Sequence, residues 1–219
     1  MYTAQRPFFR APHSENILFA NSSSKSGSTT SQNLQYRAPK LADVDNISNL
    51  LVDCFESELK WFEFPEREAR RKRYRDMLQK SFLRRMNDEG STVSFMLMVE
   101  FPSEKNPVGF VQMGMLPPPP FFGDPSDDSE DKTKDVPYIA NLCVAPSYRK
   151  SGIGKKMVEI CIRWLEKRGN FVNVFIAVDA DNFAAKCFYE GIDFVWIEPP
   201  EKNINPTRDY YYRPIIRKG

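Results

Sequence analysis

The chain has 219 residues, of which 41% are hydrophobic, and a formal charge of +2 at pH 7. This length suits one domain with appendages, because a core built from roughly 150 to 180 residues buries enough apolar surface to fold alone. The nearly balanced charge excludes a protein that binds polyanions over its whole surface, and the apolar runs are shorter than the roughly 20 residues that a membrane span needs.

Residues 1–33 are rich in serine and threonine, contain one acidic residue, and show neither a helical nor a strand period. We predict a disordered tail, because so few apolar residues cannot form a core. Transit peptides have a similar composition, so a cleaved leader is the alternative. A retained tail suits a cytoplasm of the bacterial type, whereas a cleaved one suits the plastid stroma.

Residues 34–219 are predicted to form a single domain in which strands and helices are interspersed. Alternating apolar residues indicate strands, and apolar residues spaced by three and four indicate helices. Predicted strands cover residues 34–38, 92–100, 108–116, 138–144, 172–178, 194–197 and 210–215, and predicted helices cover 44–55, 66–86, 152–168 and 182–190. This order predicts the α/β fold class, with a mixed central sheet flanked by helices.

Residues 117–137 interrupt this pattern. They begin with four consecutive prolines and continue with mostly acidic side chains. Because proline cannot donate to the hydrogen-bond ladder of a sheet, we predict a solvated loop inserted within the domain.

The helix predicted over residues 66–86 carries nine lysine or arginine residues against three acidic ones. A nucleic-acid surface is one interpretation of this charge. However, Tyr74, Met77, Leu78 and Phe82 form an apolar stripe, and no aromatic residues interleave with the basic ones. We therefore favour a core helix with a solvated basic face, and no nucleic-acid partner is expected.

The four cysteines lie in apolar segments and form no C-x-x-C pair, and the single histidine, His13, stands in the tail. These cysteines are Cys54, Cys143, Cys161 and Cys187. They are predicted to be core thiols in a reducing compartment, with a disulfide or a zinc site as the weaker alternative. No metal is expected.

Gly152 and Gly154 stand at the start of the helix predicted over residues 152–168. Glycines let several backbone N–H groups converge on a phosphate, and the helix dipole adds positive potential there. Arg149, Lys155 and Lys156 add charge at the same place. A G-x-G pair also occurs in ordinary tight turns, and the chain has neither a P-loop nor a complete dinucleotide fingerprint.

Two signatures at a fixed separation are more specific than this loop alone. The first contains Leu142, Cys143, Val144, Arg149, Gly152 and Gly154, and the second contains Asn182, Ala185, Tyr189, Gly191 and Phe194. Together they resemble the acetyl-CoA-binding core of the GNAT N-acetyltransferase superfamily, and in particular its protein N-terminal acetyltransferases. The resemblance covers residues 138–198, and the N-terminal half agrees in its order of elements.

The resemblance implies a GNAT-like fold, acetyl-CoA as co-substrate, and direct transfer of the acetyl group to a primary amine in a ternary complex. A bulged strand at Leu142, Cys143 and Val144 would present backbone groups to the pantetheine arm and the acetyl carbonyl. Asn182 would hydrogen-bond the cofactor, and Tyr189 would protonate the departing thiolate. The pyrophosphate would bind the loop formed by Lys150, Ser151, Gly152, Ile153, Gly154 and Lys155.

The two side chains of the second signature also have structural interpretations. Asn182 is a good helix N-cap, and a single tyrosine such as Tyr189 is usually part of a core. A phenol of pKa about 10 donates to a nascent thiolate with modest gain, so most of the rate should come from holding the amine beside the thioester.

The general base is less clearly marked. In N-terminal acetyltransferases of the superfamily a Glu or His commonly stands five residues before the asparagine, where this chain has Ala177. Tyr138 matches a tyrosine of the eukaryotic enzymes and would relay a proton through water, although an aromatic residue that covers a strand edge is its structural alternative.

The missing base bears on the acceptor. Protein N-terminal α-amines are the expected acceptors, because they lose a proton more readily than lysine side chains, which form a second class. An acetyltransferase for a small amine and a non-catalytic acyl-CoA-binding module are the alternatives.

Overall fold

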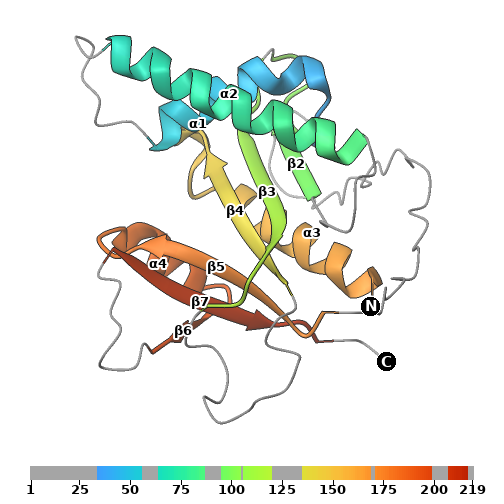
Figure 1. Ribbon diagram of the computed structural model, residues 1–219, viewed down its shortest axis with the longest axis vertical. Helices are drawn as coiled ribbons and strands as arrows, with labels where there is room; N and C mark the ends of the chain where they lie inside the picture. The colour runs from blue at the N-terminus through green and yellow to red at the C-terminus, as the bar shows by residue number, and fades with distance from the viewer. Residues whose placement is uncertain are drawn as a thin grey trace, which may run out of the picture.

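The computed structural model describes residues 34–55, 64–86, 95–104, 106–119, 135–168, 171–198 and 207–216, with side chains of the helix over 64–86 described at 66 and 68–80. The predicted tail of residues 1–33 and most of the predicted insert 117–137 lie outside this part of the chain. The described residues form a mixed sheet with helices on its two faces, which confirms the predicted fold class (Figure 1).

The helices and strands follow the predicted order. They are β1 (Gln35–Arg37), α1 (Val44–Phe55), α2 (Phe64–Met86), β2 (Phe95–Glu100), β3 (Gly109–Leu116), β4 (Val136–Val144), α3 (Ile153–Arg168), β5 (Asn173–Asp179), α4 (Phe183–Glu190), β6 (Val195–Ile197) and β7 (Arg208–Pro214). β4 begins at Val136, two residues earlier than predicted, so Pro137 belongs to a strand. It lies near the start of β4, a position where a sheet tolerates a residue without an N–H.

The strands are ordered β1-β2-β3-β4-β5-β7-β6 in one sheet. All neighbouring strands are antiparallel except β4 and β5, which are parallel and pair at Tyr138 and Phe175. Beyond this pair the two strands diverge, as Figure 1 shows. The opening between them lies in the middle of the sheet.

Two apolar clusters hold the helices against the sheet. α3 and α4 pack on one face, where Met157, Leu165 and Tyr189 meet the apolar side chains of β2, β3, β4 and β5. α1 and α2 pack on the other face, where Leu51 and Leu78 meet β2, β3 and β4. The clusters share no helix, so each face of the sheet is covered independently.

The basic helix α2 behaves as its apolar stripe predicted. Tyr74, Met77 and Leu78 pack against the cluster below it, and Leu78 is fully buried. Lys72, Arg73 and Lys80 are exposed. A solvated basic face therefore accounts for these exposed residues, whereas Arg70 is half-buried. The predicted stripe residue Phe82 lies outside the described side chains.

β4 contains a bulge near its end. Phe110 of β3 pairs with Cys143, and Gln112 pairs with Ala140, so the one residue between them on β3 faces two residues, Asn141 and Leu142, on β4. Asn141 has φ of 54°, a left-handed conformation that asparagine tolerates better than most residues. The bulge lies at the start of the segment for which the resemblance implied one.

Candidate functional site

A cleft of about 1800 Å³ opens where β4 and β5 separate. Its walls come from the end of β4, the loop before α3, the start of α4 and the C-terminal end of α1. All but one of the predicted site residues line it, the exception being Ser151. The predicted site residues that line the cleft are Tyr138, Leu142, Cys143, Val144, Lys150, Gly152, Ile153, Gly154, Lys155, Asn182 and Tyr189.

The edge of β4 that faces this cleft is paired with a neighbouring strand over only part of its length. β4 pairs with β3 along its other edge, and its pairing with β5 is recorded at Tyr138. Peptide groups of a strand need hydrogen-bond partners, so the segment from Leu142 to Val144 can bind an extended ligand through the groups that β3 and nearby side chains do not use. The Val144 carbonyl oxygen is not among these groups, because it accepts from Arg149 and Cys54. The pantetheine arm of coenzyme A, which contains two amides, suits this edge.

The loop before α3 can hold an anion. Lys150 has φ of 62° and Gly152 has φ of 83°, and such left-handed residues turn successive N–H groups toward one side of a loop. α3 begins at Ile153, so the unpaired N–H groups and the positive end of its dipole face the same place. Ser151 turns away, because its hydroxyl donates to the Tyr148 carbonyl oxygen at 2.6 Å.

Gly154 has a different role from Gly152. A Cβ atom at Gly154 would lie 3.3 Å from the Phe188 ring of α4, whereas one at Gly152 would meet nothing within 4 Å. Gly154 therefore lets α3 and α4 approach closely, and Gly152 supplies a backbone conformation that a side chain would strain.

Asn182 caps α4. Its Oδ1 accepts a hydrogen bond from the Ala185 N–H at 3.0 Å, so the structural interpretation of this residue is confirmed. The Nδ2 group has two further N–H donors, and the residue is exposed at the cleft. One side chain can therefore cap the helix and donate to a ligand.

Tyr189 is 8% exposed, and its ring packs edge-on against Phe188 and Phe194. Burial, with the nearby Cys161 and Cys143 thiols, raises the pKa of the Tyr189 phenol above its ordinary value. The phenol is therefore protonated at neutral pH, as a proton donor must be, but the raised pKa makes it a weaker acid than an ordinary tyrosine. Its acid role stays a prediction.

Tyr138 is 6% exposed, and its ring centroid lies 5.6 Å from that of Phe175. Burial, with a smaller contribution from Tyr210, raises the pKa of the Tyr138 phenol. A phenol that stays protonated can hydrogen-bond a water but is a weak proton acceptor. The covering role of Tyr138 is confirmed, and a water relay through it stays a prediction.

The end of β5 and the start of α4 are where a general base would be expected. Ala177 of β5 lines the cleft and pairs with Tyr210 of β7. Asp179 and Asp181 also line the cleft, and the Arg208 guanidinium lies 3.7 Å from the Asp179 carboxylate. Their carboxylates are exposed, so solvent screens their effect on a reacting amine.

Sequence analysis missed the wall that α1 and α2 contribute, which includes Cys54, Phe55, Arg70 and Tyr74. It also predicted four core cysteines. Cys143 and Cys161 are buried, but Cys54 is partly exposed and Cys187 is exposed. Cys54 and Cys187 both lie at helix positions beside the cleft, and helical spacing does not show which part of an apolar face remains uncovered.

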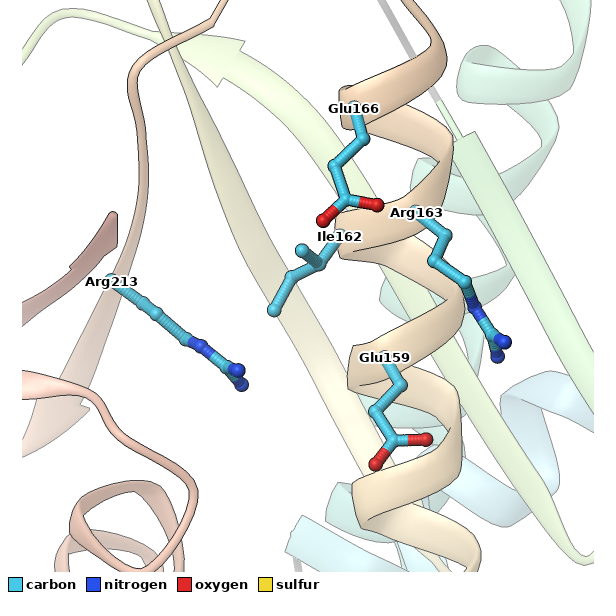
Figure 2. Close-up of a pocket in the computed structure, with 5 residues that line it drawn as sticks. All are labelled: Glu159, Ile162, Arg163, Glu166 and Arg213. Atoms are coloured by element: carbon cyan, nitrogen blue, oxygen red, sulfur yellow. The ribbon is translucent and has the colours of Figure 1, made fainter. Parts of the chain in front are cut away.

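A second hollow, of about 180 Å³, lies between α3 and β7 (Figure 2). Figure 2 shows the Arg213 side chain extending toward the face of α3 that carries Glu159 and Glu166. Arg213 also donates to the Ile192 carbonyl oxygen at 2.9 Å. The hollow contains none of the predicted site residues, and it is best explained as a charged surface between two elements.

The described residues contain neither a membrane-spanning helix nor a cluster of metal ligands. Within them no helix is long and apolar enough to cross a membrane. Among the same residues, no group of three or more His, Cys, Asp or Glu side chains could hold a metal ion. The donor set of the cleft consists instead of peptide groups, lysines and an amide, which suits a phosphorylated thioester such as acetyl-CoA.

Comparison with protein families identifies residues 45–194 as matching the acetyltransferase (GNAT) family. Among curated proteins, the probable N-acetyltransferase san of Drosophila melanogaster is 34% identical over 37% of this chain and 46% of its own length. N-alpha-acetyltransferase 50 of Danio rerio is 38% identical over 36% of this chain and 42% of its own length. The [ribosomal protein bS18]-alanine N-acetyltransferase of Escherichia coli is 37% identical over 27% and 40%. The chain thus spans less than half the length of the curated relatives it matches.

Two solved structures show the same fold. PaiA N-acetyltransferase from Thermoplasma acidophilum, solved in complex with coenzyme A, has a TM-score of 0.60 at 13% identity and covers 83% of this chain and 99% of its own. The ribosomal-protein-S18-alanine N-acetyltransferase from Escherichia coli has a TM-score of 0.51 at 17% identity, and the match covers 85% of this chain and 97% of that protein. At such identities the likeness concerns the fold.

Proposed function

Because the chain belongs to the GNAT acetyltransferase family, we propose that it transfers the acetyl group of acetyl-CoA to a primary amine. Protein N-terminal α-amines are the preferred acceptors, and lysine side chains are a weaker second class. The relatives named for acetylating the α-amine or a ribosomal alanine support this choice of acceptor.

One observation carries the proposal: a single cleft brings together a bulged strand edge, an anion-binding loop and a buried phenol. The edge Leu142 to Val144 would bind the pantetheine arm, and the loop from Lys150 to Lys155 would bind the pyrophosphate. These two contacts would place the thioester near Tyr189. Holding the amine beside the thioester then supplies most of the rate.

The transfer step forms a C–N bond and breaks a C–S bond. The neutral amine attacks the thioester carbonyl, and the departing thiolate takes a proton from the Tyr189 hydroxyl. The proton that the amine loses leaves through water, for which Tyr138 offers a hydrogen-bonding group. Tyr189 then recovers a proton from solvent, so the net products are an amide and free coenzyme A.

The acceptor class follows from the cost of removing the proton from the amine. At pH 7 a neutral α-amine of pKa about 8 costs about 1.4 kcal/mol, whereas a neutral lysine of pKa about 10.4 costs nearly 5 kcal/mol. Ala177 lines the cleft where a base would be expected. The raised pKa of Tyr138 keeps its phenol protonated at neutral pH, so it is not available as a base. The cleft therefore favours the amine that is already easier to deprotonate.

A thiol-release assay with matched acceptors tests the proposal. The acceptors are a lysine-free peptide with a free α-amine, the same peptide α-blocked with one added lysine, the α-blocked peptide without lysine, and spermidine. We expect turnover of the free α-amine to exceed that of lysine by about 250-fold at pH 7, because the two pKa values differ by about 2.4 units. The fully blocked peptide reports background hydrolysis.

Faster turnover of spermidine than of either peptide would contradict the acceptor class and favour a small-amine enzyme. Tight binding of acetyl-CoA without turnover of any acceptor would contradict acetyl transfer to these amines and favour a binding module.

A further inference from the structure

Two cysteines that are far apart in the sequence meet in the wall of the cleft. Cys54 lies in the last turn of α1, Cys143 lies in β4, and both line the cleft. Cys143 belongs to the apolar cluster beneath α1 and α2, and Cys54 packs against this cluster. The Cys54 thiol donates to the carbonyl oxygen of Val144, the residue that follows Cys143, at 3.5 Å. We call Cys54 and Cys143 the thiol pair.

The bulge in β4 turns Cys143 toward α1. Side chains of a strand alternate between faces, and Ile139 packs on the face covered by α3. With regular alternation, Cys143 would point to that same face. The extra residue at Asn141 reverses the alternation, and Cys143 packs instead with Leu51 of α1.

A positive charge is held beside the thiol pair. The Val144 carbonyl oxygen accepts a hydrogen bond from Arg149 Nε at 3.2 Å and one from the Cys54 thiol at 3.5 Å. The two donors share one acceptor, so the guanidinium stays close to the Cys54 sulfur. Such a charge stabilises a thiolate.

The two thiols differ in reactivity. The hydrogen bond from Cys143, followed by the contact with Arg149, lowers the pKa of the Cys54 thiol to about 7, although partial burial opposes this. An ordinary thiol of pKa about 8.5 is roughly 3% thiolate at pH 7, and a lowered pKa increases this fraction. Burial, followed by the contact with Cys54, raises the pKa of Cys143, which therefore stays protonated.

We propose that Cys54 is an oxidation site of this protein and that its product is a disulfide with Cys143 across the cleft wall. An accessible thiolate next to a second thiol is the arrangement found in redox-sensitive cysteines. The oxidant is a hydroperoxide, with hydrogen peroxide as the simplest member. This inference goes beyond acetyl transfer and does not depend on it.

The reaction proceeds in two balanced steps. The Cys54 thiolate attacks one oxygen of hydrogen peroxide, forming an S–O bond and breaking the O–O bond. The product is a sulfenic acid, and the released hydroxide takes a proton to become water. The Cys143 sulfur then attacks the Cys54 sulfur, forming the S–S bond and expelling hydroxide, which takes the Cys143 proton. Overall two thiols lose two hydrogens, and one peroxide becomes two waters.

The first experiment maps the product in the full-length protein. The reduced chain is treated with stoichiometric hydrogen peroxide at pH 7, the remaining thiols are alkylated, and the peptides are analysed by mass spectrometry. We expect one peptide pair joined through Cys54 and Cys143, with the loss of two hydrogens and reversal by dithiothreitol. Cys54→Ser should abolish it, Cys187→Ser should preserve it, and Cys143→Ser should leave a sulfenic acid at Cys54 that dimedone traps.

The second experiment measures reactivity without oxidation. The rate of Cys54 alkylation by iodoacetamide is followed against pH, and its midpoint is expected near 7. Cys143→Ala and Arg149→Gln should both move the midpoint upward, whereas Cys143→Ser keeps a hydrogen-bond donor and should move it less. Preferential oxidation of the exposed Cys187, or a Cys54 midpoint near 8.5, would overturn the proposal.

Discussion

Replacing Gly152 by alanine tests whether the backbone conformation of the loop before α3 matters for binding acetyl-CoA, without adding a steric clash. Gly152 has φ of 83°, and a Cβ atom there would meet nothing within 4 Å. The substitution therefore adds no steric clash. It affects only the backbone, which an alanine holds in this left-handed conformation at a cost of about 1 to 2 kcal/mol.

This cost can appear in two measurable ways. If the loop keeps its conformation, the free energy of unfolding falls by about 1 to 2 kcal/mol, which lowers the melting temperature by roughly 2 to 8 °C for a domain of this size. If the loop relaxes, its N–H groups turn away from the pyrophosphate, and acetyl-CoA affinity falls about 10-fold for each 1.4 kcal/mol of binding free energy lost.

The assay combines calorimetric titration with acetyl-CoA and thermal unfolding of the unliganded protein. Gly114→Ala is the matched control, because a Cβ atom at Gly114 also meets nothing within 4 Å, and Gly114 lies in β3 away from the loop. We expect the control to bind acetyl-CoA as the parent chain does. If Gly152→Ala leaves both affinity and melting temperature unchanged, the reasoning about this loop is refuted.

Three further outcomes follow from the cleft. Tyr189→Phe should lower kcat by about 10²-fold with little change in the acetyl-CoA dissociation constant, because phenylalanine keeps the ring packing but cannot donate a proton; thiol release and calorimetry check this. Asn182→Ala should lower the free energy of unfolding by about 1 kcal/mol, because the N-cap hydrogen bond to the Ala185 N–H is lost; denaturant unfolding measures this. Asn182→Asp should keep the cap but weaken acetyl-CoA binding, which calorimetric titration measures. In the pH dependence of kcat/KM, the rate with an α-amine acceptor should rise and flatten near pH 8, while the rate with lysine keeps rising to about pH 10, because only the neutral amine attacks; equal midpoints would indicate a base that the cleft does not reveal.

The order of elements could be predicted from the sequence because its signals are local. α4 is an example: Asn182 precedes it, Gly191 follows it, and both were expected at those places. The start of β4 was less well predicted, since Pro137 was taken as part of a loop. A proline tolerated near the start of a strand looks the same in sequence as one that ends it.

The surroundings of the site residues could not be predicted in this way. Tyr138 was expected either to relay a proton or to cover a strand edge. Its packing on Phe175 depends on where β4 and β5 separate, and that is set by residues distant in sequence. The contact of Cys54 with Cys143 has the same origin. Periodicity placed each residue on an apolar face and could not show that the two faces meet.

The bulge at Asn141 connects these features. A strand that kept its alternation through Asn141 would turn Cys143 toward α3, and it would turn Leu142 and Val144 toward α1. The observed packing is the reverse, with Leu142 and Val144 against the cluster that contains α3 and Cys143 against α1. The same extra residue therefore shapes the strand edge proposed to bind acetyl-CoA and brings Cys143 to Cys54. Because one backbone irregularity sets both, a change that straightens β4 should disturb acetyl-CoA binding and thiol reactivity together.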